Sequence, residues 1–408
     1  MNDSLPDVVL LVPVEAASEP WPADQAGEAP SAPVPVPAEQ PPRNNLVRRI
    51  ASAISSASEW LFGAFALVLG LSILSAMPVL QFLVFGYLLE AGGRVARTGR
   101  LRDGFVGCRK AARVGRMVIG CTLMMLPLWF GSSMAADAAI VDPGGSVARG
   151  WRLGLVVLTV LLFTHMAIAC ARGGKIRYFL WPFPNPFWLA RRVRQGGAYA
   201  AARDGTWEFV AGLRFPYYFR LGLLGFLGTM AWLVVPVSLL AAGRRLPVLG
   251  FLGALLLAVV APSLLFIQTR FAVENRFRAL FEFRAIRQCF RRAPWAYAFA
   301  FVISAVFAVP LYLLKIEMIP REVAWLPALV FLGFIFPARL LAGWAYSRSQ
   351  RRAQSRHWFV RWTGRLIVIP IAVAYVFIVF MTQFTAWQGF WSLYEQHAFL
   401  LPVPFVNL

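Results

Sequence analysis

The chain has 408 residues, of which 59% are hydrophobic and only 14% are charged, whereas an ordinary soluble domain carries about 25% charged residues. Lys and Arg number 40 against 19 Asp and Glu, which gives a formal net charge of +21. This composition argues against a soluble globular protein and favours the lipid bilayer. The four cysteines and three histidines are too scattered along the chain to predict a disulfide framework or a metal site, and no cofactor is expected.

Residues 1–42 are predicted to form a disordered tail. This segment holds ten prolines and seven acidic residues, and such a segment buries too little apolar surface to offset the entropy of ordering. In residues 43–59, Leu46, Ile50, Ile54 and Ala57 recur at four- and three-residue spacing. That stripe predicts an amphipathic segment in the membrane interface.

Residues 60–384 are predicted to form an all-α transmembrane domain, a polytopic helix bundle. Eight apolar runs are nearly free of charge and about as long as the roughly 20 residues that a bilayer requires. Residues 385–408 are predicted to be a C-terminal tail. The predicted spans are about 60–86, 117–134, 153–171, 221–241, 247–268, 296–314, 326–344 and 366–384.

The connections between these runs alternate in charge. In chain order they carry 8, 2, 9, 2, 7, 2 and 6 Lys or Arg residues. A nucleic-acid-binding protein would gather its basic residues in one module, so no nucleic-acid partner is expected. The alternation is instead the pattern of a multi-pass protein whose basic connections face the cytoplasm. The stretch 270–294 carries seven arginines and five phenylalanines, and we expect it to lie against anionic headgroups, as two short helices or as one helix packed on two sides.

The first span leaves a conflict open. The alternation puts the N-terminal tail outside, but Arg43, Arg48 and Arg49 precede the first span and favour the inside. Residues 60–89 form either one helix that continues beyond the bilayer or a hairpin bent at Pro78. We expect the single helix, and the side of the tail stays undecided.

Two segments resemble each other within the chain. "PVLQFLVFGYLLEAGGR" begins at Pro78 and "PSLLFIQTRFAVENRFR" begins at Pro262, an offset of 184 residues. Either this is chance in a chain rich in Leu and Arg, or spans one to four and five to eight are parallel repeats. Parallel repeats occur in transporters, whose sites lie between the halves. The offset aligns Glu90 and Arg94 with Glu274 and Arg278.

These four residues are candidate interfacial ion pairs, with a matched pair of gates as the alternative reading. The candidate intramembrane polar site consists of His165 and Arg339, because ionisable groups at membrane depth are rare and often functional. His165 is satisfied by a neighbouring carbonyl or hydroxyl, or it lines a cavity. Arg339 reaches the interface, or it pairs with a buried partner or an anionic headgroup. Aligning Trp151 with Trp325 sets His165 opposite Arg339.

Two motifs carry a resemblance to known proteins. Gly86, Tyr87, Leu88 and Leu89 follow a span-ending proline, and Arg270, Phe271, Glu274 and Phe277 lie in a juxtamembrane helix. In these features the chain resembles a group of uncharacterised bacterial multi-pass membrane proteins classed under a domain of unknown function. The resemblance covers about a fifth of the chain and implies a bacterial cytoplasmic membrane. It implies no catalytic residues.

No P-loop, GxGxxG, HExxH or GxSxG motif occurs in the chain, and we expect no enzymatic activity. The expected function is that of a scaffold, assembly or accessory component whose basic cytoplasmic face binds anionic membrane lipid or a protein partner. The alternative is a transporter of a lipid or hydrophobic small solute. A membrane-embedded enzyme would require a cluster of histidines or carboxylates that the sequence does not indicate.

Overall fold

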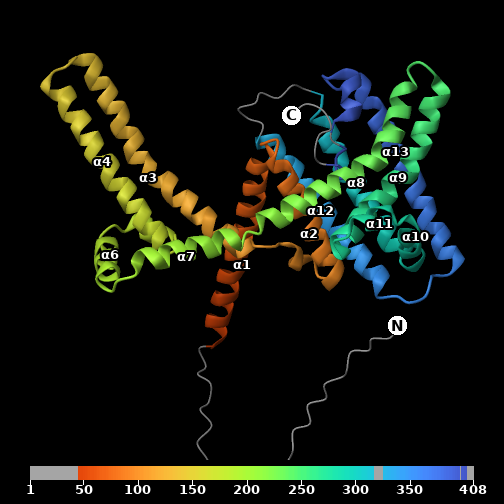
Figure 1. Cartoon of the computed structure of the whole chain (residues 1–408), viewed down its shortest axis with the longest axis horizontal. Coiled ribbons are helices and arrows are strands. Elements are labelled where there is room, and N and C mark those ends of the chain that lie inside the picture. The colour runs from red at the N-terminus through yellow and green to blue at the C-terminus, as the bar shows by residue number, and fades with distance from the viewer. Residues whose placement is uncertain (1–44, 317–324, 396, 402–408) are drawn as a thin grey trace, which may run out of the picture. The chain divides into compact units, whose positions relative to one another are not determined.

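The computed structural model describes residues 45–316, 325–395 and 397–401, so the predicted tail 1–42 lies outside the described residues. Over the described residues the chain is an all-α membrane protein, as predicted (Figure 1). Eight of its helices are long and apolar enough to span a bilayer. These are α1 (Asn45–Ser75), α3 (Cys108–Val141), α4 (Ser146–Ala171), α8 (Phe215–Ala242), α9 (Pro247–Glu274), α11 (Pro294–Leu313), α12 (Trp325–Gln350) and α13 (Trp358–Thr385).

The seven later spans coincide with the predicted apolar runs, from 117–134 in α3 to 366–384 in α13. Several of these helices begin where the sequence supplies a proline, as α9 does at Pro247 and α11 at Pro294. Proline suits the first helical turn, because its φ angle is already helical and its missing N–H has no partner there. Length, apolarity and starting prolines together explain why these helices could be predicted.

The first predicted span is wrong, because the run 60–86 is not one helix. α1 ends at Ser75 and a second helix, α2 (Leu80–Thr98), begins after a turn that contains Pro78. Proline lacks an N–H and disfavours a helical conformation in the preceding residue, so a helix usually stops before it. At its other end α1 is continuous through residues 45–59 of the predicted interfacial segment, which contain no proline or glycine to interrupt the helix.

α1 and α2 form a hairpin. After α2 the chain makes a short 3₁₀ helix, η1 (Leu101–Gly104), and then meets α1 again. The rings of Trp60 and Phe105 lie with centroids 4.9 Å apart, and the Cys108 thiol donates to the carbonyl oxygen of Trp60 at 3.3 Å. At Phe105 the chain has therefore returned alongside α1 to the position of Trp60, as the hairpin alternative requires.

α2 is the most enclosed long helix of the described residues, and glycines allow its close packing. A Cβ on Gly86 would lie 1.8 Å from the carbonyl oxygen of Tyr218 in α8, and one on Gly93 would lie 2.9 Å from Cβ of Ala272 in α9. α12 approaches the third side, where a Cβ on Gly343 would lie 2.2 Å from a backbone oxygen of α2. Small residues let membrane helices approach at backbone distance, so α2 is fixed between α8, α9 and α12.

The two longest basic connections fold into short helices. Residues 172–214 contain α5 (Ile176–Leu180), α6 (Pro184–Arg194) and α7 (Ala198–Ala211). Residues 270–294 contain the 3₁₀ helix η2 (Phe277–Phe281) and then α10 (Phe283–Arg292), which is the two-helix alternative. The strongly amphipathic α10 carries its arginines on one side and buries Ile286 and Cys289.

A helix ending recurs in the fold, but in a register different from the predicted one. α2 and α9 both end in a left-handed residue, Gly99 with φ 76° and Asn275 with φ 52°, followed by an extended arginine and a 3₁₀ helix. The 184-residue offset would instead align Gly99 with Phe283. Glu90 lies in the middle of α2 whereas Glu274 is the last residue of α9, so the aligned residues do not occupy equivalent positions.

The basic connections after α2, α9 and α12 meet at one end of the bundle. Arg351, which follows α12, donates from Nη2 to the carbonyl oxygen of Thr98 at the end of α2, at 2.8 Å. The backbone N–H of Arg356 donates to the carbonyl oxygen of Arg291 in α10 at 2.9 Å. Connections that are far apart in sequence therefore share one basic surface.

The arginine-poor connections meet one another as well. The backbone N–H of Trp387, which follows α13, donates to the carbonyl oxygen of Lys315 after α11 at 3.3 Å. Arg244, which follows α8, lies 5.3 Å from the ring centroid of Phe390 in the 3₁₀ helix η4 (Gly389–Tyr394). In these contacts the basic connections meet basic connections, and the arginine-poor ones meet arginine-poor ones.

Within the predicted C-terminal tail, residues 397–401 are a core element. Residues 397–401 are each no more than 2% exposed, and they pack with the helices in the main hydrophobic core. The sequence there reads "HAFLL". Burial of these apolar side chains offsets the entropy of ordering the segment.

Candidate functional site

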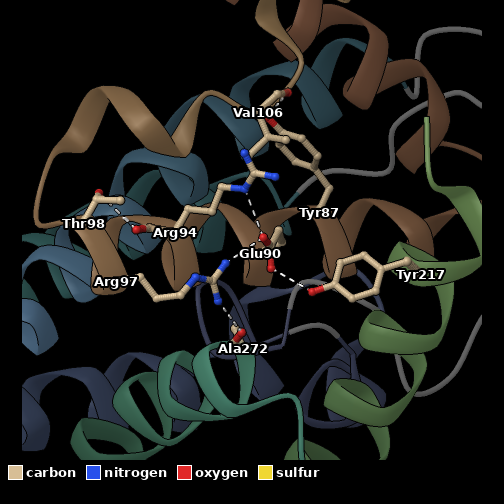
Figure 2. A network of polar contacts seen from close by, with 8 residues as sticks. All are labelled: Tyr87, Glu90, Arg94, Arg97, Thr98, Val106, Tyr217 and Ala272. Atoms are coloured by element: carbon tan, nitrogen blue, oxygen red, sulfur yellow. Dashed lines mark hydrogen bonds and ion pairs between the residues drawn. The ribbon is translucent and has the colours of Figure 1, made fainter. Parts of the chain in front are cut away.

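Glu90 is the centre of a polar network in the middle of α2 (Figure 2). Its carboxylate is 5% exposed, and Oε1 accepts from Arg94 Nε at 3.0 Å and from Arg97 Nη2 at 2.8 Å. Oε2 accepts from the Tyr217 hydroxyl of α8 at 2.9 Å. Arg97 also donates from Nη1 to the carbonyl oxygen of Ala272 at 3.1 Å. The network therefore joins α2 to both α8 and α9.

The arrangement of this network indicates a structural role, that of holding α2 against α8 and α9. Both carboxylate oxygens are occupied, and the single buried negative charge is paired with two arginines. A buried carboxylate is tolerated when its charge is paired and its lone pairs are satisfied. Tyr87, one turn before Glu90, adds a bond from its hydroxyl to the carbonyl oxygen of Val106 at 3.0 Å and so holds the chain beyond η1 (Figure 2).

Glu274 lies in a separate cluster at the end of α9. Its carboxylate pairs with Arg270 at 2.9 Å and also with Arg276, while Arg270 pairs in addition with Glu282. Arg278 is exposed on η2 and makes no ion pair with any residue that the structure describes. The two glutamates thus have different arginine partners, and none of the ion pairs in the described ranges joins the two networks.

His165 fastens α4 to the connection that follows it. A carbonyl oxygen only accepts, so His165 Nε2 donates to Phe179 O at 2.8 Å, and Nδ1 accepts from the Asn185 amide at 3.2 Å. Asn185 is fully buried, donates to Tyr178 O at 2.8 Å and accepts from Arg172. Every polar atom of the pair is satisfied, so this site holds α5 and α6 and contributes no open ligand position.

Arg339 is also buried, in the middle of α12, and its polar partners are Gln268 of α9 and backbone carbonyls of residues 399 and 400. It shares no partner with His165, whose contacts belong to a separate hydrophobic cluster. The structure thus divides the predicted intramembrane pair into two sites.

A cavity of about 460 Å³ opens between the start of α11 and the end of α12, at the basic end of the bundle. Three arginines line it: Arg348 from the last turn of α12, and Arg352 and Arg356 from the connection to α13. Trp295 and Trp344 line the same space, and the Arg348 guanidinium carbon lies 5.0 Å from the Trp344 ring centroid. We call this space the arginine cavity.

The electrostatics of the arginine cavity are one-sided. No Asp or Glu lines it, and among the described residues none of its arginines is within ion-pair distance of a carboxylate. α11 begins at Pro294 on its wall, so the positive end of a helix dipole adds to the same field. Such a site favours an anion, and arginine matches the oxygens of phosphate and carboxylate groups.

An apolar groove of about 470 Å³ lies on the other side of the first turn of α11. Most of its lining is aliphatic or aromatic and comes from α9, α10, α11 and α13, with Arg287 and Arg365 as its two charged residues. Pro294 and Phe290 contact Gly364 between the two spaces, where an added Cβ would lie 3.0 Å and 3.4 Å from their nearest atoms. Cationic and apolar surfaces therefore adjoin, which suits an amphiphilic anion.

Sequence reasoning did not identify this cavity. The signal was present in the three arginines at 348, 352 and 356 and in the two tryptophans that flank spans, but the sequence could not pair the end of α12 with the start of α11. Among the described residues no cluster of three or more His, Cys, Asp or Glu side chains has a geometry for holding a metal ion.

No family model, curated protein or solved structure matches the chain.

Proposed function

We propose that this integral membrane protein is a non-enzymatic scaffold or accessory component that binds anionic phospholipid through the arginine cavity. The observation that carries the proposal is the set of three arginines, Arg348, Arg352 and Arg356, around one cavity that no carboxylate lines. A phosphodiester headgroup would supply the missing negative charge and up to two free oxygens for bidentate contacts.

The surroundings support a lipid in preference to a free anion. Trp295 and Trp344 line the cavity, and tryptophan is enriched at the membrane interface because its ring is amphipathic. The adjoining apolar groove offers a surface for an acyl chain. The positive-inside pattern of the connections favours the cytoplasmic leaflet of a bacterial membrane as the location of this site.

The proposal is tested by lipid binding to the full-length protein in a neutral detergent. Native mass spectrometry counts bound phosphatidylglycerol and, in parallel, bound phosphatidylcholine. We expect R348Q/R352Q/R356Q to lose at least about tenfold in affinity for phosphatidylglycerol, because each charge-assisted bond contributes about 1.5–3 kcal/mol and 1.4 kcal/mol is a factor of ten. Binding of phosphatidylcholine should change little.

The matched control removes the same number of charges from another basic connection. R191Q/R192Q/R194Q changes three exposed arginines of α6 that line neither the arginine cavity nor the apolar groove. The control variant should bind phosphatidylglycerol like the wild type. Equal losses in the two variants would mean that net charge alone attracts the lipid, and the proposal would then be rejected.

A further inference from the structure

Arg339 lies in the middle of the membrane-spanning helix α12, and the residues that the structure describes give it no charged partner. Its side chain is 1% exposed, and no carboxylate of the described residues lies within ion-pair distance. Burial of an unpaired charge is among the most costly arrangements in a protein interior. Its hydrogen-bond partners, Gln268 and the backbone carbonyls of residues 399 and 400, are neutral, so the described residues leave the positive charge uncompensated.

The hydrogen bonds of Arg339 leave donors unused. Nη1 donates to Gln268 Oε1, and Nη2 donates to the carbonyl oxygens of Phe399 and Leu400 at 2.6 and 3.4 Å. Nε is buried without a partner. The Nε–H and one Nη2–H point the same way along one edge of a guanidinium, an edge that matches the two oxygens of a carboxylate.

Gln268 holds the site in a fixed arrangement. Its amide nitrogen donates to the Thr229 hydroxyl at 2.6 Å and to the carbonyl oxygen of Leu400 at 2.7 Å. These bonds orient Gln268 Oε1 toward Arg339. Helices α8, α9 and α12 therefore contribute one polar residue each, and the guanidinium is pre-organised for an acceptor.

In the structure, the acceptors for Arg339 Nη2 are backbone carbonyl oxygens of the segment 397–401. This segment is non-helical and doubles back on itself, with the His397 N–H donating to the Leu401 carbonyl oxygen at 2.8 Å, and Ala398 has a φ of 39°. Irregular backbone within a membrane bundle is tolerated only where protein surrounds it or where it lines a cavity. The segment meets this condition, because each of its residues is no more than 2% exposed.

We propose that Arg339 and Gln268 form a binding site for the carboxylate of an amphiphile with an apolar chain, and that residues 397–401 close this site by substituting backbone carbonyls for the carboxylate. A carboxylate would engage Nε and Nη2 together and would neutralise the charge. The apolar chain is inferred from the aromatic surroundings. The Arg339 guanidinium lies 5.5 Å from the Phe85 ring centroid, and Phe399 packs against Tyr375 at 5.4 Å and Phe301 at 6.3 Å.

Contacts outside the site anchor the segment on its N-terminal side. Lys315 Nζ pairs with Glu395 at 3.2 Å and donates to the carbonyl oxygen of Ser392 at 3.4 Å. These contacts hold η4 near the end of α11. Displacement of residues 397–401 by a ligand would break the bond from His397 Nε2 to the carbonyl oxygen of Leu393 at 3.0 Å, while the contacts of Lys315 would keep η4 in position.

The test follows the segment in the full-length protein. Ala398 is 2% exposed, so a cysteine at this position, A398C in a chain whose four native cysteines are alanine, should react slowly with a maleimide. We expect saturating oleate to raise the labelling rate at least about tenfold. Oleyl alcohol, which has the same chain without the charge, should leave the rate unchanged.

Three outcomes would overturn the proposal. They are an unchanged rate with oleate, an equal rise with oleyl alcohol, and an equal rise with oleyl phosphate, which would show that any anion suffices. R339K in the same background supplies a second measurement, because lysine keeps the charge but lacks the planar fork. This variant should lose most of the oleate response, and an undiminished response would count against the bidentate site even if R339Q failed to fold.

Discussion

Trp60 and Phe105 are in ring contact at 4.9 Å although the whole of α2 lies between them in the sequence. The contact shows that α1 and α2 form a hairpin, and it bears on the orientation of the whole chain. If α1 crosses the bilayer and α2 returns, the chain makes one more crossing than in the single-span reading, and we then predict the cytoplasmic side for the N-terminus. The arginines before the first span and the alternation of charge between the connections then predict the same side for the N-terminus.

The hairpin predicts the side of the N-terminus. An epitope tag at the N-terminus and a cysteine in place of Arg356 should be protected from the exterior in intact cells and become accessible together after permeabilisation. Antibody binding and labelling with a membrane-impermeant maleimide measure the two positions. A tag accessible from outside while position 356 stays protected would restore the single-span reading.

Glycine contacts around α2 predict a large effect from a small substitution. A Cβ on Gly222 of α8 would lie 1.8 Å from the carbonyl oxygen of Phe82. We therefore expect Gly222→Ala to lower the free energy of unfolding by about 1–3 kcal/mol, as overpacking does in other tightly packed interiors. Thermal unfolding in detergent measures the change.

The control for that substitution is Gly333→Ala in α12, where no atom lies within 4 Å of an added Cβ. Alanine has the better helix propensity, so this variant should be as stable as the wild type or more stable by up to about 1 kcal/mol. Equal destabilisation at both positions would contradict the close approach of α2 and α8.

The burial of Glu90 predicts that removing its charge lowers the stability more than removing the charge of an exposed carboxylate. Glu90→Gln removes the charge that Arg94 and Arg97 share and weakens their bonds to Oε1. Both arginines are 39% exposed, so water moderates the loss, and we expect about 1–3 kcal/mol. Asp204→Asn is the control, because its pair with Arg203 is more than half exposed on both sides and should contribute no more than about 0.5 kcal/mol.

The burial of Cys289 predicts that its thiol reacts slowly with a maleimide. It is buried in α10, and burial raises the pKa of the Cys289 thiol above its ordinary value. Because the thiolate is the reactive species, a higher pKa lowers the reactive fraction at pH 7.5, and labelling should accelerate only at pH values above the usual thiol range. Mass spectrometry after maleimide treatment should find Cys289 modified at least about 100 times more slowly than a cysteine in place of exposed Arg291. Equal rates would contradict the burial.

Most of the membrane-spanning architecture could be predicted from the sequence, because a long charge-free run has few alternatives to a spanning helix. The exception is the first predicted span, 60–86, which is divided between α1 and α2. Pro78 divides a run that is continuous in composition, and Gly86, Gly92 and Gly93 with Glu90 mark α2 as a helix packed by protein. Read together, the glycines and the carboxylate would have favoured the hairpin.

The sites were harder to predict, because their residues come from distant parts of the chain. Glu90 depends on Tyr217 of α8, and Arg339 depends on Gln268 and on carbonyl groups near residue 400. Local spacing carries no information on such partners. The arginine cavity likewise requires α11 to begin beside the end of α12, which is a consequence of packing and not of periodicity.

The anionic-lipid site at the arginine cavity is the central functional claim, and it is tested most directly by an experimental structure of the protein in phosphatidylglycerol nanodiscs. We predict density for a phosphate group within hydrogen-bond distance of at least two of Arg348, Arg352 and Arg356, with an acyl chain along the neighbouring apolar surface. An empty cavity beside ordered lipid at other basic connections would contradict the claim.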